Sequence, residues 1–271
     1  MRAVAVAVAL VLLLTGCQPA SGPVGAPVPS PAAATSVAPA STPVAPASAT
    51  TTGTTPTPVS PVTPTPPTSP TSEPATPAEP PKDTRKGARL DTPWVVDGIP
   101  LVSRQHRVSA AYRPQHPAGP YGLERKANTA LRKLTAAAAA DGVRIVVRSG
   151  YRSYATQASI YRQQLASYPS KELAKRYNAP AGASEHQTGL SVDLWDGTTW
   201  GLGMARTKAG VWLWKHSREY GFVLRYPPGT KQEKITGYTY EPWHFRWIGV
   251  ERALDFKPNS RRTLEQYLGL A

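Results

Sequence analysis

The chain contains two short stretches in which a histidine stands near a carboxylate. In SEHQTGLSVDLWD (184–196), His186 precedes Asp193 by seven residues. Along one regular strand an odd offset sends two side chains to opposite faces. The two side chains can therefore meet only if the backbone turns between them, and Gly189 supplies a residue suited to such a turn.

The second stretch, GYTYEPWHFRWIG (237–249), places Glu241 three residues before His244, with Pro242 between them. The proline favours a break in the strand, which allows this pair to converge as well. Together the two stretches offer two imidazoles and one aspartate, a set that can hold zinc and leave a fourth position open for water. Glu241 would then act as a general base on that water, whose pKa the metal lowers toward neutral.

A structural interpretation competes with this one, because a histidine near a carboxylate is common by chance. The occurrence of two such pairs in one chain favours a metal site, but spacing alone leaves both interpretations open. The other three of the five histidines are expected to be structural or exposed. His106 and His116 lie in a Pro-rich segment, and His216 lies near a predicted helix end, where a positive charge meets the helix dipole favourably.

Composition divides the 271 residues into two parts. The stretch 18–80 holds 18 of the 30 prolines, and Ala, Thr, Ser, Val and Gly make up almost all the rest. Because it has no aromatic residue, Leu or Ile, it cannot bury enough apolar surface to fold. We expect a disordered Pro/Ala/Thr/Ser-rich linker there, and one folded domain over residues 81–271, which is long enough for a single core.

The first 17 residues, MRAVAVAVALVLLLTGC, resemble a bacterial lipoprotein signal peptide. One positive charge precedes an apolar run over 3–14, which is too short to span a bilayer as a helix. The run leads to Cys17, the only cysteine of the sequence and the expected site of lipidation; an ordinary signal peptide with a coincidental cysteine is the alternative. We expect export, anchorage by lipid to the outer face of a bacterial cell membrane, and a folded part without disulfides or thiolate metal sites.

The folded part is strongly basic. Residues 81–271 contain 30 basic and 15 acidic side chains, which gives a net charge of +15. This balance favours an anionic neighbour such as a cell-wall polymer, although an ordinary solvated surface is the alternative. The basic residues form no block, and they accompany neither an aromatic RNA-binding motif nor a helix-turn-helix signal, so nucleic acid is not expected as a partner.

Hydrophobic periodicity and helix breakers locate the elements that must position these residues. Residues 94–120 are expected to be an irregular lead-in. Helices are expected at 122–142, 153–168 (capped by Ser153) and 207–221 and in the stretches VERALDF and SRRTLEQYLGL. Strands are expected at 143–149, 189–195, 222–226 and, interrupted at Pro242, 237–249. This mixture lacks regular βαβ alternation and predicts an α+β fold, a small antiparallel sheet flanked by helices.

Three longer stretches resemble the VanY-type D-alanyl-D-alanine carboxypeptidases, zinc peptidases related to lysostaphin-type endopeptidases and to the hedgehog signalling domain. They are SGYRSYATQ (149–157), SEHQTGLSVDL (184–194) and YGFVLRYPPGTKQEKITGYTYEPWHFRWIG (220–249), and they occur in the order of that family. The resemblance runs over about residues 94–256, and its motifs are long. It implies the zinc-peptidase fold shared by hedgehog domains and D-Ala-D-Ala peptidases.

The resemblance also implies roles for individual residues. His186, Asp193 and His244 match the zinc ligands, and Glu241 matches the catalytic base. Arg152 matches the arginine that polarises the scissile carbonyl and stabilises the developing oxyanion. Four residues are expected to contact substrate or to line the site: Ser184, Tyr154, Gln157 and Trp243.

Some positions depart from the family pattern or lie outside it. Ser191 stands where the family usually has alanine, and its hydroxyl could be accommodated or could bond a neighbouring group. Arg148, four residues before Arg152, is interpreted as structural. Five tryptophans are expected to pack in the core more readily than to form a glycan platform: Trp195, Trp200, Trp212, Trp214 and Trp247.

The implied activity is zinc-dependent hydrolysis of the bond to the terminal D-Ala of peptidoglycan stem peptides. A D,D-carboxypeptidase that trims pentapeptides is the favoured hypothesis. One alternative is an L,D-carboxypeptidase that acts on tetrapeptides with the same fold. The other is an inactive zinc-bearing wall-binding module, against which the complete set of ligands, base and arginine argues.

Overall fold

The computed structural model describes residues 79–271. The expected signal peptide (1–17), its Cys17 and residues 18–78 of the expected linker lie outside the described residues. Within the described part, none of the helices combines the length and the apolar character needed to cross a membrane.

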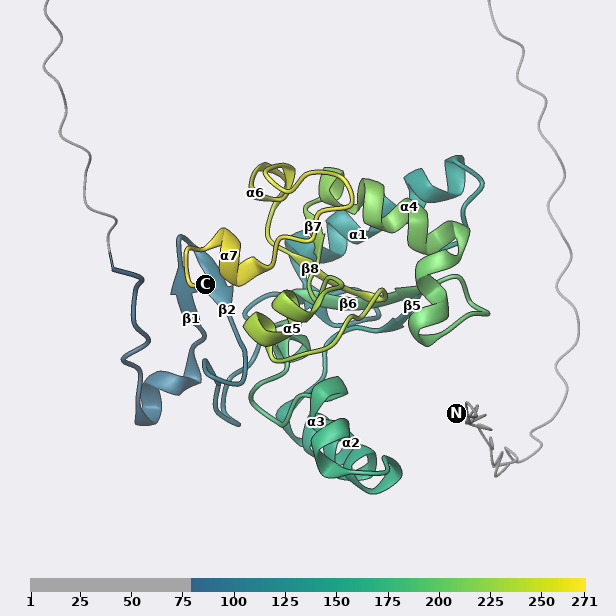
Figure 1. Ribbon diagram of the computed structural model, residues 1–271. Coiled ribbons are helices and arrows are strands. Elements are labelled where there is room, and N and C mark those ends of the chain that lie inside the picture. Colours follow the sequence, from purple (N-terminus) through teal and green to yellow (C-terminus); the bar gives the residue numbers. More distant parts are fainter. Residues whose placement is uncertain (1–78) are drawn as a thin grey trace, which may run out of the picture. The chain divides into compact units, whose positions relative to one another are not determined.

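The described residues form short helices and strands in mixed order (Figure 1). The strands are β1 (Trp94–Val96), β2 (Ile99–Leu101), β3 (Pro117–Ala118), β4 (Leu123–Glu124), β5 (Val146–Ser149), β6 (Ser191–Trp195), β7 (Phe222–Leu224) and β8 (His244–Trp247). The α-helices are α1 (Arg125–Ala140), α2 (Tyr154–Ser167), α3 (Lys171–Tyr177), α4 (Lys208–His216), α5 (Thr230–Thr236), α6 (Val250–Leu254) and α7 (Leu264–Tyr267). Short 3₁₀ helices cover Gly87–Asp91, Glu185–Thr188, Gly201–Arg206 and Ser217–Tyr220.

The central sheet has four antiparallel strands in the order β5-β6-β8-β7. The register of β6 and β8 sets Asp193 directly opposite His244. Between β5 and β6 the register shifts from Val147 to Ser149, so that Arg148 is an extra residue of β5, as in a β-bulge. The predicted α+β fold with a small antiparallel sheet is confirmed.

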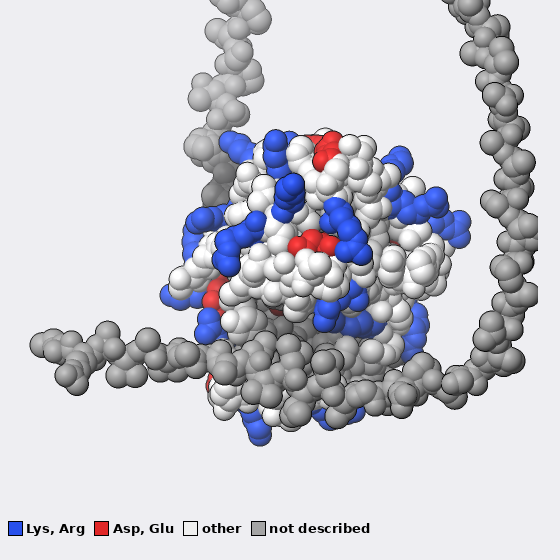
Figure 2. All heavy atoms as spheres, turned by 90° about the vertical axis from the view of Figure 1, so that its right-hand side faces the viewer, with Lys and Arg blue, Asp and Glu red and all other residues white. Residues whose placement is uncertain are grey.

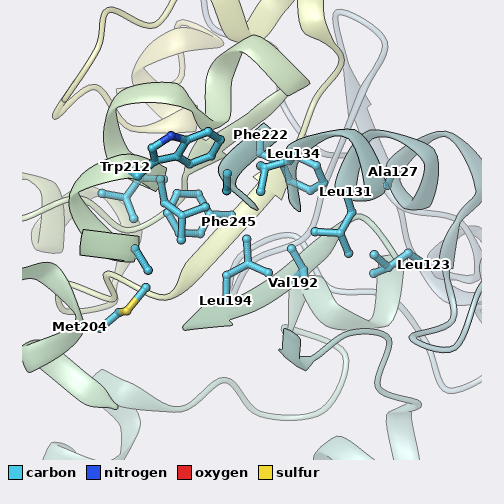
Figure 3. Close-up of a cluster of buried hydrophobic side chains, with 14 residues drawn as sticks. Leu123, Ala127, Leu131, Leu134, Val192, Leu194, Met204, Trp212, Phe222 and Phe245 are labelled. Atoms are coloured by element: carbon cyan, nitrogen blue, oxygen red, sulfur yellow. The ribbon is translucent and has the colours of Figure 1, made fainter. Parts of the chain in front are cut away.

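One face of the sheet carries the main hydrophobic core. α1 and α4 lie on this side in Figure 1, whereas α2 and α3 lie on the other. Val192 and Leu194 of β6 and Phe245 of β8 pack with Leu131 and Leu134 of α1 in this core (Figure 3). Since successive residues of a strand point to opposite faces, the residues between these apolar positions are directed away from the core.

A second core lies under the hairpin formed by β1 and β2. Val96, Ile99 and Leu101 pack there with Ile248 and with residues of α6 and α7. The turn of the hairpin contains Asp97 at φ 50° and Gly98 at φ 74°, as a tight two-residue turn requires. The expectation of an irregular segment over 94–120 was therefore partly wrong, because strands of three residues are too short to give a clear alternation.

The longer predicted elements are confirmed to within a few residues. α1, α2 and α4 lie inside the expected helical ranges, and the Ser153 side chain accepts a hydrogen bond from the backbone nitrogen of Thr156, as a helix cap does. The 3₁₀ helix Ser217–Tyr220 continues α4 within the expected range 207–221, whereas α3, α5 and the other three 3₁₀ helices were not predicted. Each spans two turns or fewer, so its periodic signal is weak.

Candidate metal centre

The first pair of candidate ligands is brought together by a turn at Gly189. The 3₁₀ helix Glu185–Thr188 ends there, with Gly189 in the left-handed region at φ 68°. A Cβ at Gly189 would lie 3.1 Å from the backbone nitrogen of Glu124, so the close approach of the neighbouring chain also favours glycine. The turn sets Nε2 of His186 3.2 Å from Oδ1 of Asp193, as the sequence led us to expect.

The second pair converges because the chain turns immediately before β8. The backbone nitrogen of His244 donates to the carbonyl oxygen of Glu241 at 3.2 Å, which closes the turn that contains Pro242. Nδ1 of His244 then lies 3.2 Å from Oδ1 of Asp193 and 3.7 Å from Oε2 of Glu241. All four side chains are buried.

The donor set fits a zinc ion. The ligand atoms of His186, Asp193 and His244 lie within 4.8 Å of one another, and Nε2 of His186 and Oδ1 of Asp193 are buried without a hydrogen bond to any described residue. Two ligands at about 2.0–2.1 Å from a tetrahedral zinc are about 3.4 Å apart. The two distances of 3.2 Å between the aspartate oxygen and the imidazole nitrogens are close to that value.

Each imidazole is oriented by a contact on its far side. Nδ1 of His186 lies 2.6 Å from the carbonyl oxygen of Gly150, so this nitrogen carries the proton and Nε2 keeps its lone pair for a metal. In His244 it is Nδ1 that faces Asp193, while Nε2 makes no hydrogen bond to a described residue and lies 3.7 Å from Oε2 of Glu185. The two rings meet edge to face, with centroids 4.8 Å apart.

Burial and neighbouring charges set the protonation of the metal-free site. Burial lowers the pKa of His186 to about 4, which keeps this ring neutral. Burial opposes the charge of His244 too, but Asp193 and Glu185 outweigh it and raise the pKa of His244 to about 9. Burial raises the pKa of Glu241 to about 8, close to the range that suits a general base at neutral pH.

A buried ionic cluster that the sequence analysis missed supports His244. Glu185, only 1% exposed, accepts hydrogen bonds from Nε of Arg225 at 2.9 Å and Nη1 of Arg246 at 2.8 Å. Although burial disfavours its charge, the two guanidinium groups hold the pKa of Glu185 well below its usual range. The carboxylate of Glu185, which its two arginines favour in the ionised form, therefore faces Nε2 of His244. One signal was available, since Arg246 lies two residues after His244 and so on the same face of its strand.

The cluster also includes contacts to α7 and to β2. Nη1 of Arg225 donates to Oε2 of Glu265 in α7 at 3.0 Å. Nη2 of Arg246 donates to the carbonyl oxygen of Pro100 in β2. The support of His244 thus reaches elements well outside the motifs that resemble the family.

Ser191 joins the same cluster. Its hydroxyl donates to Oε2 of Glu185 at 3.1 Å and is fully buried. The departure from the usual alanine is therefore accommodated by a hydrogen bond to a neighbouring carboxylate, one of the two outcomes that the sequence left open.

Arg152 lies beside the candidate ligands. Its backbone nitrogen donates to the carbonyl oxygen of His186 at 3.1 Å, and Nη1 lies 4.0 Å from Oδ2 of Asp193. Its Nε is buried and makes no hydrogen bond to a described residue. The guanidinium is thus held next to the donor set with donors free for a substrate oxygen.

A cavity of about 470 Å³ opens on the candidate ligands. Arg152, Glu241 and the three ligands line it, together with three of the four residues expected near substrate, Ser184, Gln157 and Trp243. The fourth, Tyr154, does not line it and lies against the backbone at Gly182, where an added Cβ would be 3.2 Å from Cε2 of the tyrosine.

The tryptophans divide between core and cavity. Four of the five expected in the core do lie in or against it: Trp195, Trp212, Trp214 and Trp247. Trp200 differs from the expectation, because it is 39% exposed, lines the cavity and packs against Trp243 with ring centroids 4.9 Å apart. It follows β6 after a short loop, and this position at the end of the strand was not used in the sequence analysis.

The remaining histidines lie apart from the candidate ligands. Nδ1 of His106 is 3.1 Å from Oδ2 of Asp83, and its half-buried ring packs on Trp94. His116 is exposed, and Nδ1 of His216 is 3.2 Å from Oε1 of Glu219 near the end of α4. None of the three lines the cavity, as expected.

Comparison with known proteins places this geometry in a family. Residues 121–250 match the family described as VanY, D-alanyl-D-alanine carboxypeptidase. A D-alanyl-D-alanine carboxypeptidase of Enterococcus faecalis is 34% identical over 178 residues, which are 62% of this chain and 64% of that protein. The match thus spans somewhat less than two thirds of the relative's own length.

Solved structures of similar proteins share the fold. The vancomycin-resistance D,D-pentapeptidase VanY of a VanB-type cassette, solved as a mutant with Zn(II), is 34% identical. It aligns with a TM-score of 0.54 over 62% of this chain and 97% of that one. The LdcB LD-carboxypeptidase is 29% identical and aligns with a TM-score of 0.55 over 67% of this chain and 96% of that one. In sequence and in fold, the chain belongs to the VanY D-alanyl-D-alanine carboxypeptidase family.

Proposed function

We propose that this protein is a zinc-dependent D,D-carboxypeptidase that hydrolyses the bond to the terminal D-Ala of peptidoglycan stem peptides. The observation that carries the proposal is the convergence of a zinc-type donor set, a buried glutamate and an arginine on one cavity. The likeness to VanY, whose structure contains Zn(II), supports the same metal and chemistry.

The residues of the cavity suit the steps of peptide hydrolysis. A zinc ion held by His186, Asp193 and His244 would supply a Lewis acid and make a water molecule more acidic. Glu241 accepts a proton from the attacking water molecule as the oxygen of that water forms a bond to the scissile carbonyl carbon. Arg152 donates a hydrogen bond to the oxygen on which negative charge develops. When the C–N bond breaks, Glu241 returns the proton to the leaving amine nitrogen.

An L,D-carboxypeptidase acting on tetrapeptide stems is the second candidate. The likeness to the LdcB LD-carboxypeptidase favours it, because the fold and the extent of the alignment are nearly the same as for VanY. The complete set of ligands, base and arginine argues against an inactive zinc-bearing wall-binding module.

One experiment separates these candidates. The purified chain, loaded with zinc, is offered synthetic pentapeptide and tetrapeptide stems, and mass spectrometry follows the loss of one alanine with and without a chelator. Chelator-sensitive loss from the pentapeptide is the expected result. Loss from the tetrapeptide alone would replace the D,D activity with the L,D activity, and no loss from either stem would contradict both.

We also propose that the protein works outside the cell, attached to the membrane by lipid at Cys17 and held near anionic wall polymers by its charge. The net charge of +15 over residues 81–271 supports the second part, and Lys and Arg are spread over the face shown in Figure 2. A Cys17→Ala variant should leave the membrane fraction of the producing cell. Binding to purified wall should weaken as salt increases, and salt-insensitive binding would contradict electrostatic retention.

A further inference from the structure

Arg148 is presented to the cavity by an irregularity of the sheet. It is the extra residue of β5 at the register shift between Val147 and Ser149. Such bulges re-aim side chains and are frequent beside active sites. The Arg148 side chain lines the same cavity as the candidate zinc ligands.

Two indole rings hold the guanidinium of Arg148. Its central carbon lies 4.3 Å from the ring centroid of Trp200 and 5.1 Å from that of Trp195. Trp200 in turn packs against Trp243, the residue that precedes the ligand His244. Stacking fixes the plane of a guanidinium but leaves the donors along its edge free, so Arg148 can still bind a planar anion with two hydrogen bonds.

No carboxylate of the described residues pairs with Arg148, which makes no ion pair and no side-chain hydrogen bond within residues 79–271. The three carboxylates that line the cavity are engaged elsewhere. Glu185 binds two buried arginines, Asp193 belongs to the donor set, and Glu241 is the proposed base. The cavity therefore offers a positive charge, preorganised by stacking, that no residue within 79–271 neutralises.

We propose that Arg148 forms a subsite for a carboxylate of the peptide substrate, a role that rests on the function proposed above. A stem peptide offers this chemistry in two places, at its C-terminus and on a third residue whose side chain ends in a carboxylate, such as diaminopimelate. The same guanidinium geometry recognises either one. The subsite selects stems that carry the matching carboxylate over stems in which it is an amide.

Calorimetric binding to the zinc-loaded full chain tests this subsite. A Glu241→Gln background prevents turnover during the measurement. Three pentapeptides are compared: one with a free diaminopimelate side-chain carboxylate and a free C-terminus, one with that side-chain carboxylate amidated, and one with the C-terminus amidated. Each is bound to the background protein and to the same protein with Arg148→Gln, Arg148→Lys or, as a control, Arg132→Gln. Arg132 is an exposed arginine of α1 that does not line this cavity.

Arg148→Gln should weaken binding of the free peptide by about tenfold, the size expected of a charge-assisted hydrogen bond at a partly exposed site. Arg148→Gln should not change the affinity for the peptide in which the carboxylate bound by Arg148 is amidated. The amidated peptide whose affinity is unchanged therefore identifies which of the two carboxylates Arg148 binds. Arg148→Lys should retain part of the affinity, and Arg132→Gln all of it. Equal losses for all three peptides, or no loss for any, would overturn the subsite.

The failure of this inference can be told apart from failure of the proposed function. Hydrolysis is followed separately in protein with Glu241 intact. If the protein hydrolyses a stem peptide but the effect of Arg148→Gln on affinity does not depend on a peptide carboxylate, the subsite is contradicted and the proposed activity stands. If the effect of Arg148→Gln depends on one carboxylate but no stem peptide is hydrolysed, the subsite stands and the proposed activity is contradicted. Absence of binding by all three peptides removes the subsite as well.

Discussion

At the scale of single residues, Glu241 has the most direct part in the proposed reaction. It is buried, its Oε2 lies 3.7 Å from Nδ1 of the ligand His244, and burial raises its pKa to about 8. Glu241→Gln keeps the shape of the side chain and removes its ability to accept a proton. We expect turnover to fall by about 10²–10⁴-fold or more, the usual contribution of a general base, while zinc stays bound.

Parallel measurements of stem hydrolysis and of zinc content by atomic emission check this prediction. The unaltered protein and an Arg132→Gln variant serve as controls. Retained turnover in the zinc-loaded Glu241→Gln protein would show that another group takes the proton.

We expect Glu185 to affect protein stability and zinc affinity although it is not one of the candidate ligands. Glu185→Ala leaves Arg225 and Arg246 buried without their shared carboxylate, which should cost about 3–5 kcal/mol of unfolding free energy. It also removes the anion beside Nε2 of His244, so zinc affinity should fall by about 10–100-fold. Denaturant unfolding measures the first effect, and competition with a chromogenic chelator measures the second.

Ser191→Ala is the matched control, because it removes one hydrogen bond to the same carboxylate and leaves both arginines in place. It should cost about 1 kcal/mol or less and leave zinc affinity nearly unchanged. If both variants bound zinc as tightly as the original protein, Glu185 would have no part in orienting His244.

At the scale of elements, the turn at Gly189 determines whether the ligands meet. Gly189→Ala places a Cβ in a left-handed conformation and within 3.1 Å of the backbone nitrogen of Glu124. The backbone strain alone should cost about 1–2 kcal/mol, and the crowding should displace the turn and weaken zinc binding. Gly142→Ala is the control, since Gly142 has φ +69° but no atom within 4 Å of the added Cβ.

The same unfolding and chelator measurements apply to both glycine variants. The control should lose stability and keep its zinc affinity. Equal zinc affinities in the two variants would mean that the contact near Glu124 does not position His186 and Asp193.

The elements also explain which features could be predicted from sequence. Local patterns located α1, α2 and β6, because their apolar spacing or caps lie within one segment. The convergence of His186 with Asp193 was inferred from Gly189, again a local feature. The partnership of Glu185 with Arg225 and Arg246 depends on strand pairing between segments 40 and 61 residues apart, which no local pattern encodes. The bulge at Arg148 was not predicted for the same reason, because a bulge is defined only by the register with the partner strand.

At the scale of the whole molecule, zinc should stabilise the fold in a pH-dependent way. Zinc binds the assembled donor set more tightly than an unfolded chain, and 1,000-fold excess over Kd corresponds to about 4 kcal/mol. In the metal-free protein the pKa of His244 is about 9, so below pH 9 a proton competes with the metal for Nδ1. Raising the pH from 6.5 to 8.5 weakens this competition, because the pH approaches the pKa of His244, and should increase the difference in Tm between zinc-loaded and chelated protein.

Differential scanning calorimetry at three pH values, with and without chelator, checks this linkage. A difference in Tm that stays constant or shrinks as the pH rises would contradict it. The Asp193→Ala protein, which lacks one ligand, should show little difference at any pH.

The cluster around Glu185 has a consequence for the smallest fragment that can work. The family match ends at residue 250 and starts at residue 121, yet Glu265 and Pro100, which hold Arg225 and Arg246, lie beyond these limits. A fragment cut at the limits of the match would contain every candidate ligand, the base and Arg152. It would nevertheless leave two buried guanidinium groups short of acceptors next to His244. We therefore expect the segment that folds on its own to be longer than the family match over residues 121–250. A fragment of 121–250 should neither fold stably nor retain zinc on a desalting column, whereas a fragment of 79–271 should do both.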